Sequence, residues 1–274
     1  MKIQKIKAVY FSPCGSVKKV VMNMASFAAG MMGVDVDVID FTLPEFRSVS
    51  YSFEYGDLVF FGSPVYAGRI PNKIAPYIAE GFNGNGACAV PVVCYGNRAF
   101  DDALAELRNL LEADGFRTVA AAATVSEHAF TDRLAPGRPN EADIEEIRKF
   151  AVAAAEKCDN AQEDYQPIRV PGANPPEKYY TPLKEDGTPA QFLKAKPQTE
   201  PLKCTKCGIC AEVCPMGCLE IADQVTASGV CIKCQACVKA CPENAIFFTD
   251  EDFLSHTKMI GSNYEARKEN QFFL

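Results

Sequence analysis

The chain lacks the features that would assign it to several common classes of protein. Its 274 residues include 28 Lys and Arg against 35 Asp and Glu, a net charge of −7. This balance argues against a nucleic-acid-binding protein, which would carry a basic face. No apolar stretch is long enough to span a bilayer. Residues 1–13 have only a short apolar run and no small-residue cleavage site, so no signal peptide is predicted. These absences predict a cytoplasmic protein.

Cysteine, by contrast, is abundant, and 8 of the 13 cysteines form two runs of identical spacing. The spacing is C-x2-C-x2-C-x3-C, a proline follows each run, and the second run lies 27 residues after the first. The first run is Cys204, Cys207, Cys210 and Cys214, and the second is Cys231, Cys234, Cys237 and Cys241. This is the pattern that binds [4Fe-4S] clusters in bacterial ferredoxins. Spacing, proline and duplication all agree, so the motif predicts a chain that carries electrons.

Residues 202–250 therefore resemble a two-cluster ferredoxin, in which the fourth cysteine of each run ligates the other cluster. The resemblance implies one cluster on Cys204, Cys207, Cys210 and Cys241 and a second on Cys231, Cys234, Cys237 and Cys214. A pair of zinc sites is the alternative. Zinc sites, however, have paired C-x-x-C units with a longer gap between them.

The other five cysteines are scattered: Cys14, Cys88, Cys94, Cys158 and Cys218. Free cysteine usually packs as a small buried hydrophobe, and we interpret Cys88 and Cys158 in that way. The counterpart of Cys218 in the second run is Ala245. Cys218 is therefore predicted to be a core substitution rather than a ligand.

Residues 1–157 alternate between short apolar segments and amphipathic ones. Strands are predicted at residues 6–11, 34–40, 57–63, 87–95 and 116–126, and helices at 17–29, 71–80, 101–113 and 141–157. Pro71 suits a first helical turn, and Asn140 suits a helix cap. This alternation predicts an α/β fold with a doubly wound, five-stranded parallel sheet. Such sheets bind ligands at the carboxyl ends of their strands.

The loop after the first strand resembles the phosphate loop of flavodoxins, in which hydroxyl residues flank a glycine at a helix N-terminus. Its candidate residues are Ser12, Cys14, Gly15, Ser16 and Val17. The loops after the third and fourth strands resemble those that flank the flavin ring of flavodoxins. Their candidate residues are Ser63, Pro64, Val65, Tyr66, Ala67, Gly68, Tyr95, Gly96, Asn97, Arg98 and Asp101. The resemblance implies an FMN site, with Tyr66 or Tyr95 stacking on the ring.

His128 follows the fifth strand and is one of only 2 histidines. Its position at the carboxyl end of a strand makes it a candidate catalytic residue that relays protons. A structural histidine is the alternative. Residues 128–139 read as an insertion that could form a lid.

Taken together, residues 1–157 and 202–248 resemble the flavodoxin–ferredoxin fusion proteins of anaerobes. We predict four parts: a flavodoxin-like FMN domain at 1–157, a proline-rich linker at 158–201, a small α+β ferredoxin-like domain at 202–250 and a tail at 251–274. Tyr179, Tyr180 and Phe192 would let the linker pack against a domain, and Phe272, Phe273 and Leu274 suggest that the tail docks.

The resemblance implies an electron-transfer protein that relays electrons between two [4Fe-4S] clusters and FMN. An FMN-dependent reductase of a small acceptor such as a quinone is one alternative, and a ferredoxin with a flavin-free docking domain is another. Redox partner proteins are expected as donor and acceptor. The sequence leaves open the identity of these partners, the direction of electron flow and whether the chain forms a homodimer.

Overall fold

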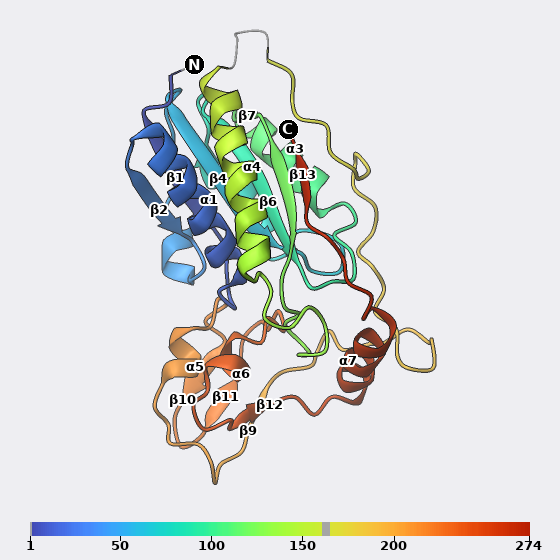
Figure 1. The fold of residues 1–274 in the computed structure, drawn as a ribbon. Helices are drawn as coiled ribbons and strands as arrows, with labels where there is room; N and C mark the ends of the chain where they lie inside the picture. The colour runs from blue at the N-terminus through green and yellow to red at the C-terminus, as the bar shows by residue number, and fades with distance from the viewer. Residues whose placement is uncertain (1, 161–164) are drawn as a thin grey trace.

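The computed structural model describes residues 2–160 and 165–274. Within the predicted linker, residues 161–164 lie outside the described residues. Five parallel strands form the central sheet (Figure 1): β1 (Lys5–Tyr10), β2 (Val36–Asp40), β4 (Asp57–Pro64), β6 (Cys88–Tyr95) and β8 (Ala121–Val125). Their spatial order is β2-β1-β4-β6-β8. This is the 2-1-3-4-5 order of flavodoxin-like sheets, so the predicted fold class is confirmed.

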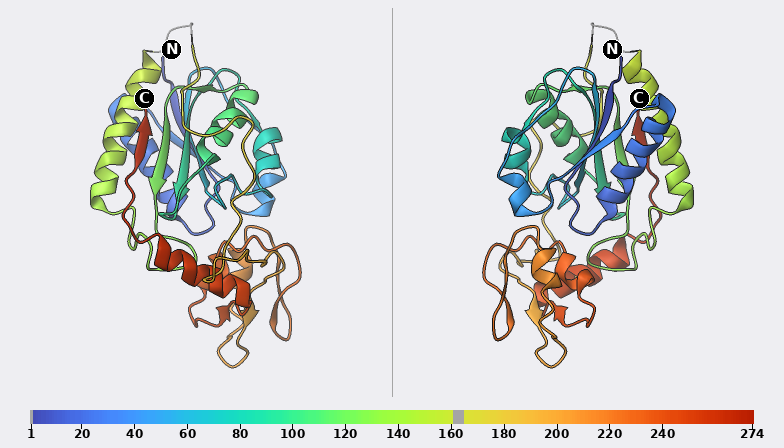
Figure 2. Two further views of the ribbon diagram at one scale, coloured as in Figure 1. Left: turned by 90° about the vertical axis from the view of Figure 1, so that its right-hand side faces the viewer. Right: turned by 90° about the vertical axis from the view of Figure 1, so that its left-hand side faces the viewer.

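Helices cover both faces of the sheet (Figure 2). α1 (Ser16–Met32) and α4 (Glu141–Asp159) pack on one face, and α2 (Ala75–Glu80) and α3 (Ala103–Ala113) pack on the other. Because both faces are covered, β4 and β6 are buried almost throughout and read as continuous apolar runs. Asn140 and Asp143 form a capping box at the start of α4, as Asn140 predicted. α2 begins later than predicted, after a turn in which the Ala75 amide donates to the Pro71 carbonyl.

Smaller strands complete the domain. β7 (Arg117–Thr118) extends the parallel pairing of β6, and β3 (Tyr51–Ser52) pairs with β5 (Phe82–Asn83) near the short 3-10 helix η1 (Pro44–Arg47). The segment predicted as a tail contains a helix, α7 (Glu251–Asn263), and a strand, β13 (Gln271–Phe273). β13 pairs antiparallel with β8, so the C-terminal end of the chain adds an edge strand to the sheet.

The two halves of the cysteine-rich module share backbone conformation as well as cysteine spacing. β9 (Gln198–Thr199) pairs with β12 (Ile246–Phe247), and β10 (Leu219–Ile221) pairs with β11 (Val225–Ala227). The short helices α5 (Ile209–Glu212) and α6 (Ala236–Ala240) lie within the two cysteine runs. Left-handed residues recur at equivalent positions in the two halves: Lys206 and Lys233, Gly208 and Gln235, Gly217 and Asn244. A duplicated chain therefore takes up duplicated local geometry around both cysteine runs.

The module lies against the carboxyl ends of the parallel strands (Figure 1). Residues 165–197 connect the two parts without a helix, as the proline content predicted. They pack closely: the Tyr179 hydroxyl donates to the Ile70 carbonyl at 2.8 Å, and the Tyr180 amide donates to the Ala67 carbonyl at 2.9 Å. Among the described residues, no helix is long and apolar enough to cross a membrane.

Candidate redox site

Two cavities in the module separate the eight repeated cysteines into two sets. One is lined by Cys204, Cys207, Cys210 and Cys241. The other is lined by Cys214, Cys231, Cys234 and Cys237, with Cys218 beside them. Within the described part of the chain, no three metal-ligating side chains converge on one point, and the thiols of each set surround a space instead. We name these spaces the first and the second cluster cavity. The structure thus groups the cysteines in the crossed sets that the resemblance implies.

Backbone amides point at sulfur atoms in both cluster cavities. The Ala245 amide donates to Cys241 Sγ at 3.2 Å, and at the equivalent position the Cys218 amide donates to Cys214 Sγ at 3.4 Å. The Lys233 amide donates to Cys231 Sγ, also at 3.4 Å. Hydrogen bonds to sulfur stabilise thiolate ligands, and in iron–sulfur sites they set the reduction potential.

The Cys218 thiol breaks the symmetry between the two cavities. Its Sγ lies 3.6 Å from Cys214 Sγ. Hydrogen bonding with Cys218 lowers the pKa of Cys214 to about 5 and the pKa of Cys231 to about 7, whereas the pKa of Cys218 itself is raised by the same contacts. Cys218 Sγ thus lies next to the sulfur of a predicted cluster ligand, and either of the two atoms can be the donor.

The second cluster cavity abuts the flavodoxin-like domain. Cys14 belongs to the predicted phosphate loop, and its Sγ donates to the Cys234 carbonyl at 2.8 Å. Although Cys14 as a residue is exposed, burial of its thiol raises the pKa of Cys14 to about 11. Lys239 pairs with Glu127 at 3.1 Å, and Arg47 donates to the Pro215 carbonyl. These contacts tie the module to three different loops of the domain.

A cavity of about 240 Å³ lies at this junction, and we name it the junction cavity. The predicted flavin loops form one side of it, through Ser12, Cys14, Ser16, Val17, Pro64, Val65, Tyr66, Ala67, Gly68, Tyr95, Gly96 and Arg98. Residues 232–234 of the second cysteine run form another side. A further part of the lining comes from residues 128–130, from Tyr180, Pro182 and Phe192 of the connecting segment, and from His256 and Ile260 of α7.

The start of α1 offers an anion site at one end of this cavity. Gly15 is left-handed at the N-cap, and a Cβ placed there would meet no atom within 4 Å. Ser12 Oγ accepts from the Lys18 amide at 2.9 Å. Among the described residues, the amides of Ser16 and Val17 have no acceptor. Free amides and the helix dipole at this end favour a phosphate group.

Two further groups in the lining fit a bound flavin. The Ser126 hydroxyl is buried in the cavity lining near the Cys94 thiol, where a bound ligand would reach it. Tyr66 also lines the junction cavity. Burial, with further contributions from the thiols of Cys234, Cys14 and Cys231, raises its pKa well above the usual value. Tyr66 is thus a neutral ring in the lining of the junction cavity.

Several predicted flavin residues have other partners. The Asn97 amide nitrogen donates to the carbonyls of Tyr264 and Ala266, and its oxygen accepts from the Lys268 amide. Asp101 pairs with Arg98, and Ser63 Oγ donates to the Pro64 carbonyl at 3.2 Å. Gly15, Ser63, Asn97 and Asp101 do not line the cavity. Asn97 instead fixes the C-terminal segment, which the sequence pattern gave no reason to place beside it.

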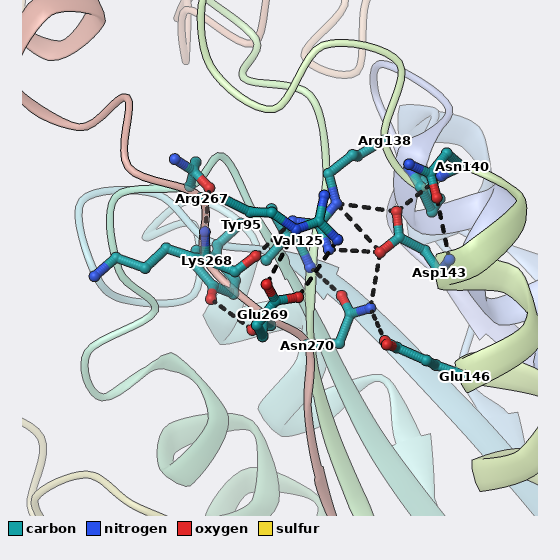
Figure 3. Close-up of polar contacts among 12 residues, drawn as sticks. Tyr95, Val125, Arg138, Asn140, Asp143, Glu146, Arg267, Lys268, Glu269 and Asn270 are labelled. Carbon is teal, nitrogen blue, oxygen red and sulfur yellow. Dashed lines mark hydrogen bonds and ion pairs between the residues drawn. The ribbon is translucent and has the colours of Figure 1, made fainter.

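Tyr95 lines the cavity, but its hydroxyl is directed at the Glu269 carbonyl, 3.4 Å away (Figure 3). Its ring packs on Phe100, with centroids 5.4 Å apart. Arg98 lies over the Tyr180 ring, with its guanidinium carbon 4.2 Å from the centroid. Of the two tyrosines predicted to stack on a flavin, Tyr66 is therefore the better placed.

His128 lines the cavity, as its position predicted. Burial is the main cause that lowers the pKa of His128 to about 4, so the ring is neutral at neutral pH. Its Nδ1 accepts from the Phe130 amide at 3.1 Å. Residues 128–139 pack on α7, since Phe130 contacts Phe253 and Leu134 contacts Met259 and Ile260.

Sequence reasoning missed the wall that the connecting segment and α7 contribute. Tyr180 and Phe192 were identified only as packing residues, and His256 and Ser126 were not identified at all. The sequence offers one signal for His256, namely that the chain has only 2 histidines. In the structure, both of them line this cavity.

Comparisons with known proteins match the two parts separately. Residues 197–220 and 228–247 match the family model described as a 4Fe-4S binding domain. A flavodoxin from the domain Archaea is 18% identical over 57% of this chain and 99% of its own, with a TM-score of 0.42. The flavodoxin of Megasphaera elsdenii is 16% identical over 55% of this chain and 98% of its own, with a TM-score of 0.35. No curated protein matches the chain.

The rubredoxin oxygen:oxidoreductase of Desulfovibrio gigas is also similar, with 16% identity and a TM-score of 0.40. The match covers 57% of this chain but only 37% of that protein. The resemblance drawn from sequence is confirmed at this level: the chain has a flavodoxin-like N-terminal region and a C-terminal 4Fe-4S binding domain.

Proposed function

We propose that the protein relays electrons between two [4Fe-4S] clusters and an FMN bound in the junction cavity. One observation carries this proposal: residues 232–234, which include the ligand Cys234, line both the second cluster cavity and the junction cavity. Only this single layer of protein would separate a cluster and a flavin held in the two cavities. Proteins of this kind supply position and potential, while the cofactors supply the redox chemistry.

The first cluster cavity would serve as the outer end of the relay. It shares no lining residue with the junction cavity, and its ligand Cys207 is exposed. An external partner protein would therefore exchange electrons at the first cluster, and the second cluster would connect it to the flavin. Donor and acceptor proteins are part of this proposal.

The residues present fit FMN. The free amides at Ser16 and Val17 would hold the phosphate, Tyr66 would stack on the ring, and the Ser126 hydroxyl would bond to the flavin. When bound, FMN would exchange electrons singly or in pairs. Anaerobic purification followed by iron, sulfide and FMN analysis tests the proposal, with about eight irons expected for two clusters and one FMN per chain. Eight irons without FMN, even after FMN is added, would leave a ferredoxin with a docking domain.

Replacement of Ser16 by glutamate is expected to weaken FMN binding strongly without loss of iron. The added carboxylate would stand at the α1 N-terminus, where the phosphate is proposed to bind, and like charges repel. Equilibrium dialysis against FMN should show an affinity lower by about 100-fold, or nearly 3 kcal/mol. Ser26→Glu, on an exposed position of the same helix, is the matched control and should bind FMN normally.

A reductase of a small acceptor remains the second candidate. The observation that favours it is the additional wall of the junction cavity, built from residues 128–130, the connecting segment and α7. A pure carrier needs no such enclosure around its flavin.

A further inference from the structure

Both histidines of the chain face the junction cavity from different elements. His128 follows β8, and His256 lies in α7, 128 positions later. Neither belongs to the three predicted flavin loops. In residues 2–160 and 165–274, neither Nε2 atom has a hydrogen-bond partner, whereas both Nδ1 atoms do. The two unpartnered nitrogens are therefore available to a ligand.

Backbone contacts give the two rings opposite hydrogen-bonding roles. His128 Nδ1 accepts from the Phe130 amide, so the neutral ring carries its proton on Nε2 and offers a donor. His256 Nδ1 lies 2.8 Å from the Leu183 carbonyl, to which it can only donate, so the neutral ring offers an acceptor at Nε2. Burial is the main cause that lowers the pKa of both histidines, which favours the neutral forms.

Aromatic rings frame this part of the cavity. The Phe192 and His256 rings lie 5.3 Å apart at an angle of 32°, and the Tyr180 and His256 rings lie 6.5 Å apart at 36°. Phe130 packs edge-on against both Phe253 and His128. Flat aromatic walls of this type favour a planar ligand.

The charged groups around the cavity are already paired. Arg98 pairs with Asp101, and Glu127 pairs with Lys239. Lys233 Nζ donates to the carbonyls of Leu193 and Cys231. A charged ligand would have to displace one of these partners, whereas a neutral one would not.

We propose that the cavity wall formed by His128, His256 and the surrounding aromatic rings binds a quinone and its hydroquinone. A quinone carbonyl would accept from His128 Nε2, and a hydroquinone hydroxyl would donate to His256 Nε2. This inference deepens the proposed function and rests on it, since it names the acceptor class. Conversion of the quinone to the hydroquinone adds two electrons and two protons. A low-potential one-electron donor protein supplies the electrons through the relay, and water supplies the protons.

His256 is the histidine that can transfer a proton to the acceptor. Its Nε2 lone pair can take up a proton and release it to an oxygen atom, while Nδ1 keeps its bond to Leu183. His128 cannot do the same without losing the Phe130 contact, so it acts as a fixed hydrogen-bond donor. The proton-relay role predicted for His128 is thereby reassigned to His256.

The test measures binding of duroquinone and durohydroquinone to the oxidised, FMN-loaded protein by anaerobic equilibrium dialysis. Duroquinone is fully substituted, so cysteine thiols do not add to its ring. His128→Leu should weaken duroquinone binding about five- to tenfold, the effect of one lost hydrogen bond, and durohydroquinone binding less. His256→Leu should show the reverse preference. His128→Gln, which restores an N–H donor, should recover duroquinone binding.

Iron and FMN content of each variant is measured first, so that a variant that fails to fold is recognised. FMN present with no binding of either compound, or with equal losses for both, overturns the quinone site and leaves the relay intact. The same holds if the histidine variants lower FMN affinity instead, because the rings would then serve the flavin edge. Wild-type protein that cannot bind FMN overturns the proposed function itself.

Discussion

Replacement of Cys231 by alanine is expected to stop electron transfer from an external donor to the flavin while FMN stays bound. Cys231 lines the second cluster cavity, which shares residues 232–234 with the junction cavity. Without this ligand the second cluster should not assemble, and the first cluster loses its only neighbour on the path. Stopped-flow reduction by a low-potential ferredoxin should slow by more than about 100-fold, beyond the range produced when only a supporting group is changed.

Cys218→Ala is the matched control for this experiment. Cys218 lines the same cavity, but its repeat counterpart is Ala245, so alanine is already accommodated at the equivalent position. The control should keep about eight irons, the content of two clusters, and transfer electrons to the flavin. Loss of four irons from the control would identify Cys218 as a ligand. Unchanged flavin reduction in Cys231→Ala protein would mean that electrons reach the flavin without the second cluster.

Sequence reasoning was strongest where one residue type has one use. Thiolates at fixed spacing have few roles other than metal ligation, and a strand buried on both faces must be apolar throughout. The cysteine runs and the five central strands could therefore be predicted from the sequence. The local start of α4 did too, because Asn140 and Asp143 satisfy the helix N-terminus within four residues.

The wall of the junction cavity that the connecting segment and α7 contribute could not be predicted in the same way. His256, Tyr180 and Phe192 reach it from segments that have no fixed spacing from the flavin loops. Asn97 is the converse case, a residue predicted at the flavin edge that has a different partner in the structure. Its amide suits a flavin edge chemically, yet it binds the backbone of residues 264–268, which is a long-range contact. Local patterns specify what a side chain can bond to, and the tertiary fold decides which partner it meets.

The C-terminal segment is held by a buried ion pair that the sequence did not indicate (Figure 3). Arg138 pairs with Asp143, and their side chains are only 4% and 1% exposed. Arg138 Nη1 also donates to the Lys268 carbonyl at 2.6 Å. Asn270 joins the network, since it donates to Asp143 at 3.0 Å and accepts from the Val125 amide at 2.9 Å. Burial acts to raise the pKa of Asp143, but its hydrogen bonds, chiefly that from Arg138, hold it below the usual value.

This network connects the chemistry of the junction cavity to the end of the chain. β13 is anchored on β8, and residues 264–270 are fixed by Asn97 and Arg138. α7 immediately precedes this segment and carries His256. The position of α7, and with it that of His256, therefore depends on contacts made at the sheet edge.

Arg138→Met should accordingly destabilise the protein by about 3–5 kcal/mol, because it leaves the Asp143 carboxylate buried without its cation. Urea unfolding of the cofactor-loaded protein measures this loss, and limited proteolysis should show cleavage within residues 264–270. Arg148→Met removes an exposed ion pair with Glu145 on α4, the helix that carries Asp143, and should leave the unfolding midpoint unchanged. If both variants unfold alike, the buried pair does not secure the segment. If only Arg138→Met loosens it, duroquinone binding should weaken in that variant as well, because α7 and His256 are then no longer held in place.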